Sequence, residues 1–125
     1  MASALKKIRI LIFEKERIVG LELKQALELK GFDACQPRSI MNARTLINRN
    51  HFDLIISDNT IINSKLIQLI NKYTNQTNIP IIYLHTKDST SFNQRKKYGI
   101  VASVAKPYNS KDLVDSIINK FQKII

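Results

Sequence analysis

The chain has 125 residues, of which 44% are hydrophobic and 24% are charged. This length and composition fit one soluble globular domain that buries roughly two-thirds of its unfolded surface. We expect a single domain over residues 1–125, with residues 1–7 as an N-terminal tail. No apolar run approaches the ~20 residues of a membrane span, and the N-terminus lacks a signal-peptide core. The lone Cys35 cannot form an internal disulfide, so we expect a reducing, cytoplasmic location.

The charge is strongly unbalanced. Twenty Lys and Arg residues stand against ten acids, which gives a net charge of +10. Such an excess favours acidic partners, whether nucleic acid, an anionic membrane surface or an acidic protein. The chain has no zinc-finger spacing and no basic stretch rich in aromatic residues, so nucleic acid is a possible partner that no motif supports.

Apolar runs alternate with amphipathic stretches along the whole chain. The pattern predicts strands over residues 8–13, 32–35, 53–57, 79–84 and 100–104. It predicts helices over residues 17–30, 42–50, 61–73, 89–98 and 110–125. In the first helix we expect Ile18, Leu21, Leu23, Ala26 and Leu27 to form the apolar side.

Two helix ends and the last helix have clear local signals. Gly31 should stop the first helix, and Ser110 stands where an N-cap belongs. In the last helix, apolar residues recur at four-residue spacing, as expected for a helix with one buried side. These residues are Leu113, Ile117, Phe121 and Ile125.

Five strand-helix repeats in one short chain predict an α/β fold with a parallel sheet and helices on both faces. The first, third and fourth strands have the continuous apolar runs of central strands, so their carboxyl ends should meet at one edge. Polar residues stand at these strand ends. They are Glu14, Lys15, Glu16, Asp58, His85, Thr86 and Lys106.

Four segments around these residues carry a family resemblance. They are ILIFEKERIV (10–19), DLIISD (53–58), IPIIYLHT (79–86) and VAKPY (104–108). Through them the chain resembles the receiver domain of two-component response regulators, the CheY-like family, over nearly its whole length. The resemblance implies a doubly wound (βα)5, flavodoxin-like, three-layer sandwich with strand order 2-1-3-4-5. It also implies that a histidine kinase transfers a phosphoryl group to Asp58 and that Lys106 contacts that group.

The metal site implied by the resemblance is altered. Glu14, Asp58 and the backbone of Thr60 would be the ligands, but Lys15 stands where the family has a second acid. The family's three carboxylates and one lysine sum to about −2, whereas here the four charges sum to about zero. Because Mg²⁺ requires oxygen ligands, we expect its binding to be weak or absent and no other cofactor to be needed. Our hypothesis is that Lys15 pairs with Asp58.

The residues that report phosphorylation in the family are also replaced. His85 occupies the Thr or Ser position, and Thr86 comes one residue late. An imidazole is larger than a hydroxyl and can be charged near neutral pH. Ser103 occupies the position of the aromatic switch, so that position has no ring to change rotamer. Signalling by the family's usual route is therefore not expected.

A second surface could meet a partner. In the family, the face formed by the fourth and fifth helices and the strand between them binds partners. Here it would include Arg95, Lys96, Lys97, Ser103 and Tyr108. The expected partners are signalling proteins, either a histidine kinase, a phosphotransfer protein or an output protein, and the chain is expected to be a monomer or a homodimer. The alternative is an ordinary solvated helix face.

Each pocket residue also has a purely structural interpretation. Asp58 could be a helix cap or a loop acid, and Lys106 a surface lysine beside a turn proline. Lys15 could extend into solvent, and His85 could simply fill space at a strand end. Glu16 could act only on the helix dipole.

Catalysis on a diffusible substrate is not expected. With only Gly20, Gly31 and Gly99, neither a dinucleotide fingerprint nor a P-loop can be written. The segment 58–60 lacks the second aspartate of a haloacid-dehalogenase-type phosphatase. We therefore expect an atypical receiver that acts by binding proteins. A phosphorylatable receiver is the second interpretation and a basic nucleic-acid-binding domain the third.

Overall fold

The computed structural model describes residues 7–58, 79–85 and 100–124. The strands are β1 (Arg9–Phe13), β2 (Asp33–Cys35), β3 (Leu54–Ser57), β4 (Ile81–His85) and β5 (Ile100–Ala105). The helices are α1 (Arg17–Leu29), α2 (Ile40–Arg49) and α6 (Ser110–Ile124). The helices predicted over residues 61–73 and 89–98 lie outside the described residues, as do residues 1–6 of the predicted tail. None of the helices in the described part is long and apolar enough to cross a membrane.

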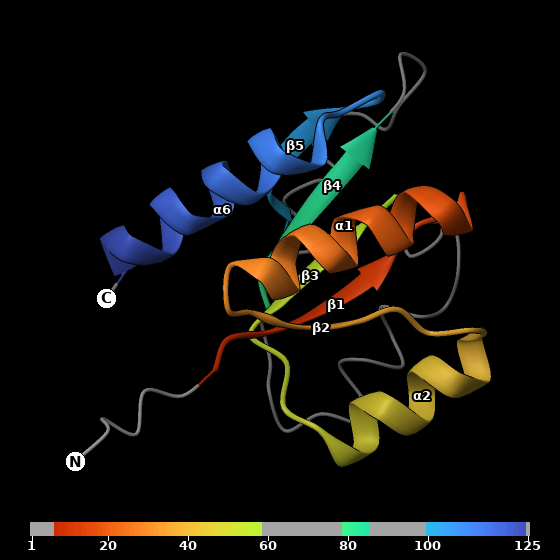
Figure 1. Ribbon diagram of the computed structural model, residues 1–125. Coiled ribbons are helices and arrows are strands. Elements are labelled where there is room, and N and C mark those ends of the chain that lie inside the picture. Colours follow the sequence, from red (N-terminus) through yellow and green to blue (C-terminus); the bar gives the residue numbers. More distant parts are fainter. Residues whose placement is uncertain (1–6, 59–78, 86–99, 125) are drawn as a thin grey trace.

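All five strands are parallel and follow the order β2-β1-β3-β4-β5, which confirms the predicted sheet (Figure 1). Between β1 and β3 the register runs from Ile10 beside Leu54 to Phe13 beside Ser57. The residues that follow β1 and β3 therefore reach the same edge of the sheet together.

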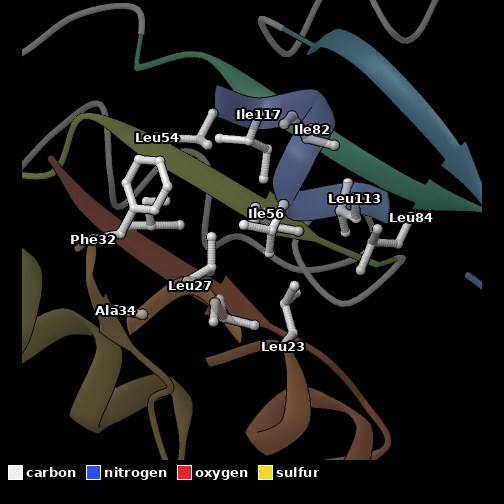
Figure 2. Packing of buried hydrophobic residues seen from close by; sticks show 13 residues of the cluster. Leu23, Leu27, Phe32, Ala34, Leu54, Ile56, Ile82, Leu84, Leu113 and Ile117 are labelled. Atoms are coloured by element: carbon white, nitrogen blue, oxygen red, sulfur yellow. The ribbon is translucent and has the colours of Figure 1, made fainter. Parts of the chain in front are cut away.

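Helices cover both faces of the sheet (Figure 1). On one face, Leu23 and Leu27 of α1 and Ile117 of α6 pack against strand residues that include Ile10 and Ile56 (Figure 2). On the other face, side chains of α2 pack with alternate residues of the same strands. That second cluster consists of Leu11, Phe13, Ala43, Ile47, Phe52, Ile55 and Ile81. Because both faces are buried, β1 and β3 are apolar at consecutive positions.

Helix α1 ends where the sequence predicts. Gly31 has a φ of 92°, a left-handed conformation that favours glycine. Its N–H donates to the carbonyl of Glu28 at 3.0 Å, and the N–H of Phe32 donates to the carbonyl of Leu27 at 3.1 Å. These two bonds satisfy carbonyl groups of the last turn and direct the chain into β2.

The buried side of α1 is narrower than predicted. Leu23 and Leu27 are fully buried, but Ile18 is 73% exposed and Leu21 is 41% exposed. The buried side instead includes Gly20, where a β-carbon would lie 2.1 Å from the Nε2 atom of Gln36. The Gln36 side chain would have to move to make room for a larger residue at position 20. The prediction that Ile18 and Leu21 belong to the buried side was wrong.

Helix α6 begins one residue away from the predicted cap. Leu113 and Ile117 are buried, as predicted. The side-chain oxygen of Asn109, not that of Ser110, accepts the N–H of Asp112 at 3.1 Å. Asn109 also offers its carbonyl to the N–H of Leu113 at 3.0 Å. Asn109 is thus the N-cap, and Ser110 is the first helical residue.

We predict that Asn109→Ala lowers the free energy of unfolding by about 1 kcal/mol, because the N–H of Asp112 loses its acceptor. Ser110→Ala is the matched control and should change the free energy by less than about 0.5 kcal/mol. Urea denaturation followed by circular dichroism measures both values. Equal losses in the two variants would contradict the assignment of Asn109 as the cap.

Candidate functional site

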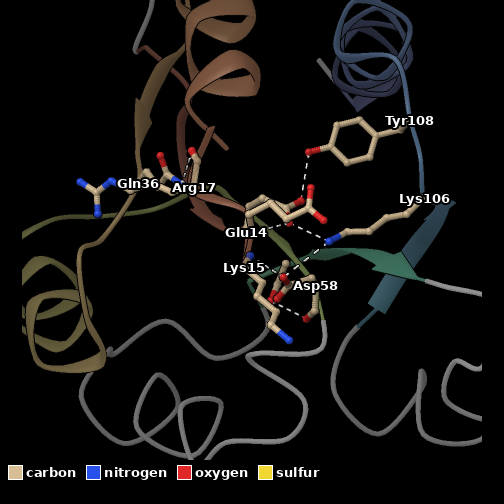
Figure 3. A network of polar contacts seen from close by, with 9 residues as sticks. Glu14, Lys15, Arg17, Gln36, Asp58, Lys106 and Tyr108 are labelled. Carbon is tan, nitrogen blue, oxygen red and sulfur yellow. Dashed lines mark hydrogen bonds and ion pairs between the residues drawn. The ribbon is translucent and has the colours of Figure 1, made fainter. Parts of the chain in front are cut away.

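Three charged residues meet at the carboxyl edge of the sheet, as predicted. Glu14 follows β1, Asp58 follows β3 and Lys106 follows β5 (Figure 3). The N–H of Asp58 donates to the carbonyl of Phe13 at 3.0 Å, and the N–H of Lys106 donates to the carbonyl of His85 at 2.7 Å. The first bond joins the ends of β3 and β1, and the second joins the ends of β5 and β4, so all three residues lie at one edge of the sheet.

The carboxylate of Glu14 is buried, and both of its oxygen atoms accept hydrogen bonds. Oε1 accepts from the ammonium of Lys106 at 2.7 Å and from the N–H of Glu16 at 3.1 Å. Oε2 accepts from the hydroxyl of Tyr108 at 3.2 Å. The exposed fraction of the Glu14 side chain is 0%. A buried charge needs such partners, so Glu14 is the centre of the polar network in Figure 3.

Lys106 contacts both acids but lies closer to Glu14. Its ammonium is 2.7 Å from Oε1 of Glu14 and 3.7 Å from Oδ2 of Asp58. Burial acts to lower the pKa of Lys106, but the hydrogen bond and negative charge of Glu14 outweigh it, with help from Asp58, so the pKa is raised. Lys106 therefore remains a cation between two carboxylates.

Lys15 contacts Asp58 differently from our hypothesis. The backbone N–H of Lys15, rather than its side chain, donates to Oδ2 of Asp58 at 2.6 Å. Asp58 itself is 5% exposed, whereas Lys15 is exposed. Within the described ranges no ion pair joins the Lys15 ammonium to Asp58, whose cationic partner there is Lys106.

Tyr108, which the sequence analysis assigns to the interaction face, contacts the pocket. Its ring is half-buried and its hydroxyl points to Glu14 (Figure 3). Burial, followed by the negative charge of Glu14, raises the pKa of Tyr108 well above its usual range. The phenol therefore remains protonated and serves as a donor. Apart from the nearness of Tyr108 to Lys106 along the chain, no pattern in the sequence indicates this contact.

A buried aromatic ring lies beside the position of Ser103. Ser103 on β5 has Tyr83 on β4 as its cross-strand neighbour. Tyr83 is fully buried, and its ring centroid is 6.1 Å from that of His85. From the sequence, Tyr83 is predicted only as a strand residue, because the register between β4 and β5 that places it beside Ser103 is not apparent there.

Several predicted site residues cannot be placed. They lie outside the described residues and are Thr60, Thr86, Arg95, Lys96 and Lys97. Of the three implied metal ligands, the structure therefore places Glu14 and Asp58. In the described part of the chain, no group of three or more His, Cys, Asp or Glu residues is arranged to hold a metal ion.

A cavity of about 650 Å³ opens beside Glu14, between the start of α1 and the start of α6. Glu16 and Val19 line it from α1, and Lys106, Pro107 and Tyr108 line it from the other side. The peptide bond between Lys106 and Pro107 is cis. The network around Glu14 thus forms one wall of an open cavity.

Comparison with known proteins gives a consistent result. Residues 10–118 match the profile of the response regulator receiver domain. The swarming motility regulation protein RssB of Serratia marcescens is 32% identical over 112 residues, which cover 88% of this chain and 51% of that protein. The probable transcriptional regulator ycf29 of Porphyra purpurea is 28% identical over 115 residues, covering 88% of this chain and 54% of that protein. The chain therefore spans about half the length of these curated relatives.

A solved structure supports the same fold. The CheY-like response regulator receiver domain protein from Methanospirillum hungatei superposes with a TM-score of 0.72 at 21% identity. The match covers 94% of this chain and 96% of that one. At this identity the likeness bears on the fold alone, and it confirms the CheY-like topology.

We predict that stability falls above about pH 10, because Tyr108 and Lys106 both bind their protons more tightly in the folded state. A raised pKa gives stability that is complete below the unfolded value and is lost as the pH rises. In Tyr108→Phe the loss between about pH 8 and pH 11 should be smaller, by up to about 1 kcal/mol after solvent screening. Denaturant midpoints measured across this range test it. Identical slopes for the two proteins would contradict the role of Tyr108.

Proposed function

This chain belongs to the response regulator receiver domain family of two-component signalling, and we propose that it is an atypical member in which magnesium-dependent phosphorylation of Asp58 is impaired. The observation that carries the proposal is the ion pair between Glu14 and Lys106 at 2.7 Å. In this arrangement, a carboxylate that the family uses for metal binding is already neutralised by a lysine of the same chain.

The residues present fit a magnesium ion poorly. Mg²⁺ requires near-octahedral oxygen ligands at about 2.1 Å, but both oxygens of Glu14 already accept hydrogen bonds. Oδ2 of Asp58 likewise accepts the N–H of Lys15. The Lys106 ammonium, 2.7 Å from Oε1 of Glu14, would repel an ion bound to that carboxylate, and Lys15 supplies no oxygen ligand in place of the missing acid.

The charge balance supports the same proposal. Two buried acids, Glu14 and Asp58, share the ammonium of Lys106, and Lys15 adds a second positive charge at the edge of the site. Two unit charges ~4 Å apart interact by about 4 kcal/mol at an effective dielectric constant of ~20. A divalent cation gains little from a site that is already neutral.

We further propose that the domain acts by binding a signalling protein, namely a histidine kinase, a phosphotransfer protein or an output protein. This role needs no phosphoryl transfer. The second candidate, a phosphorylatable receiver, is favoured by the retained contact of Lys106 with Asp58 at 3.7 Å. The two functions differ in whether Asp58 forms a covalent adduct.

Intact mass spectrometry separates the two candidates. The protein is incubated with a small-molecule phosphodonor, with and without Mg²⁺, beside an Asp58→Asn variant and a receiver domain of known activity. We expect no phosphoryl adduct on this chain under conditions that fully modify the control receiver. A magnesium-dependent adduct that disappears in Asp58→Asn would establish the phosphorylatable receiver instead.

We also predict that Lys15→Asp raises the affinity for Mg²⁺ by about tenfold or more, because it replaces a cation by an oxygen ligand beside Glu14. Lys30→Asp makes the same charge change at an exposed position at the end of α1 and should leave the affinity within about twofold. Isothermal titration calorimetry with MgCl₂ measures both variants. An equal gain in both would mean that only net charge matters, and no gain in Lys15→Asp would contradict the role of Lys15.

A further inference from the structure

Helix α2 lies in a segment that carries positive charge only. Between Asp33 and Asp53 the chain has no acidic residue, although it contains Arg38, Arg44 and Arg49. All three arginines are exposed. We call these arginines, together with Met41, the α2 arginine face. Part of the +10 excess of the chain is therefore concentrated on one helix and the residues before it.

Arg38 and Arg49 differ from those cations of the chain that have an acidic partner. Arg9 pairs with Asp33 at 2.9 Å, and Lys24 is 3.8 Å from Glu28. In contrast, Arg38 and Arg49 make no ion pair within the described residues. Their charge remains available to an acidic group from outside the chain.

The side of α2 that faces solvent is set by its buried side. Ala43 and Ile47 pack into the second core cluster. Helix α2 lies on the sheet face opposite α1 and α6 (Figure 1). At about 100° per residue, with the buried side centred between Ala43 and Ile47, Met41 and Arg49 lie on either side of the middle of the solvent-facing arc. Arg44 lies near the edge of that arc, beyond Met41. Met41 is 81% exposed. An apolar side chain thus stands between two positive ones.

The N-terminal end of α2 is held in place by local hydrogen bonds. The hydroxyl of Ser39 accepts the N–H of Asn42 at 3.0 Å, and the side-chain oxygen of Asn42 accepts the N–H of Arg38 at 3.0 Å. These bonds fix the backbone that carries Arg38. A partner would meet a preformed helix end rather than a segment that must order on binding.

From this arrangement we propose that the α2 arginine face binds an acidic protein segment in which Asp or Glu side chains flank an apolar side chain. Arg and Met are both enriched at the centre of protein interfaces, and Met adapts its shape to an apolar partner. Carboxylates bind guanidinium groups in bidentate geometry. A nucleic-acid backbone would satisfy the arginines but would leave Met41 without an apolar contact.

This inference names the partner surface for the proposed binding role and therefore rests on it. The two can still fail separately. Phosphoryl transfer is read from the mass of Asp58, whereas binding at α2 is read from variants of Arg38, Met41 and Arg49 that leave Asp58 unchanged. An adduct on Asp58 would overturn the proposed function without bearing on the α2 surface.

The test starts from a phage-displayed library of random 16-residue peptides selected on the whole chain. Enriched peptides are synthesised with a fluorophore, and their affinity is measured by fluorescence anisotropy. We expect acidic sequences that contain an apolar residue. Arg38→Gln with Arg49→Gln should weaken binding by about tenfold, and Met41→Ser by about fivefold. Because these side chains are exposed, the variants should fold, which circular dichroism verifies.

A charge-matched control separates a local effect from an effect of net charge. Lys30→Gln with Lys120→Gln removes two exposed cations from α1 and α6 and should change the affinity by less than about twofold. Equal weakening in this control would overturn the proposal, as would enrichment of no peptide or only of non-acidic peptides. Random-sequence duplex DNA is titrated in parallel. DNA binding that needs the arginines but not Met41, without peptide binding, would assign the surface to nucleic acid instead.

Discussion

The ion pair between Glu14 and Lys106 is the interaction on which the carboxyl edge of the sheet depends. The Glu14 side chain is fully buried, and removing one partner of a buried pair typically costs about 3–5 kcal/mol. The ion pair therefore connects the end of β1 to the end of β5. The hydroxyl of Tyr108, just before α6, donates to the same carboxylate. The site is held together by charges of its own chain.

The sheet could be predicted from the sequence because its pattern is strong. Strands buried on both faces leave continuous apolar runs, and the polar residue after each run marks the carboxyl edge. The buried side of α1 could not be predicted as well, because apolar residues occur on two sides of that helix. Ile18 and Leu21 are exposed, whereas Gly20 lies on the buried side beside Gln36. Periodicity within one helix does not reveal such an approach between two segments.

The sequence predicts which residues meet at the site, but not which hydrogen bonds and ion pairs join them. The strand order places the backbone positions of Glu14, Asp58 and Lys106 at the same edge of the sheet, whatever the directions of their side chains. Which acid Lys106 prefers, and the contribution of Tyr108, depend on side-chain directions that strand positions do not determine. The prediction of Ser110 as the cap of α6 was wrong for a related reason. Asn and Ser are both good N-cap residues, and only the path of the backbone decides between Asn109 and Ser110.

The contact between Lys15 and Asp58 is made by a backbone N–H, which has a consequence for how this pocket can vary. Nineteen of the twenty amino acids carry that donor, and proline alone lacks it. Position 15 can therefore change its charge in either direction without removing this hydrogen bond to Asp58. A substitution at position 15 by any residue other than proline therefore alters the charge beside the pocket separately from the bond that orients Asp58.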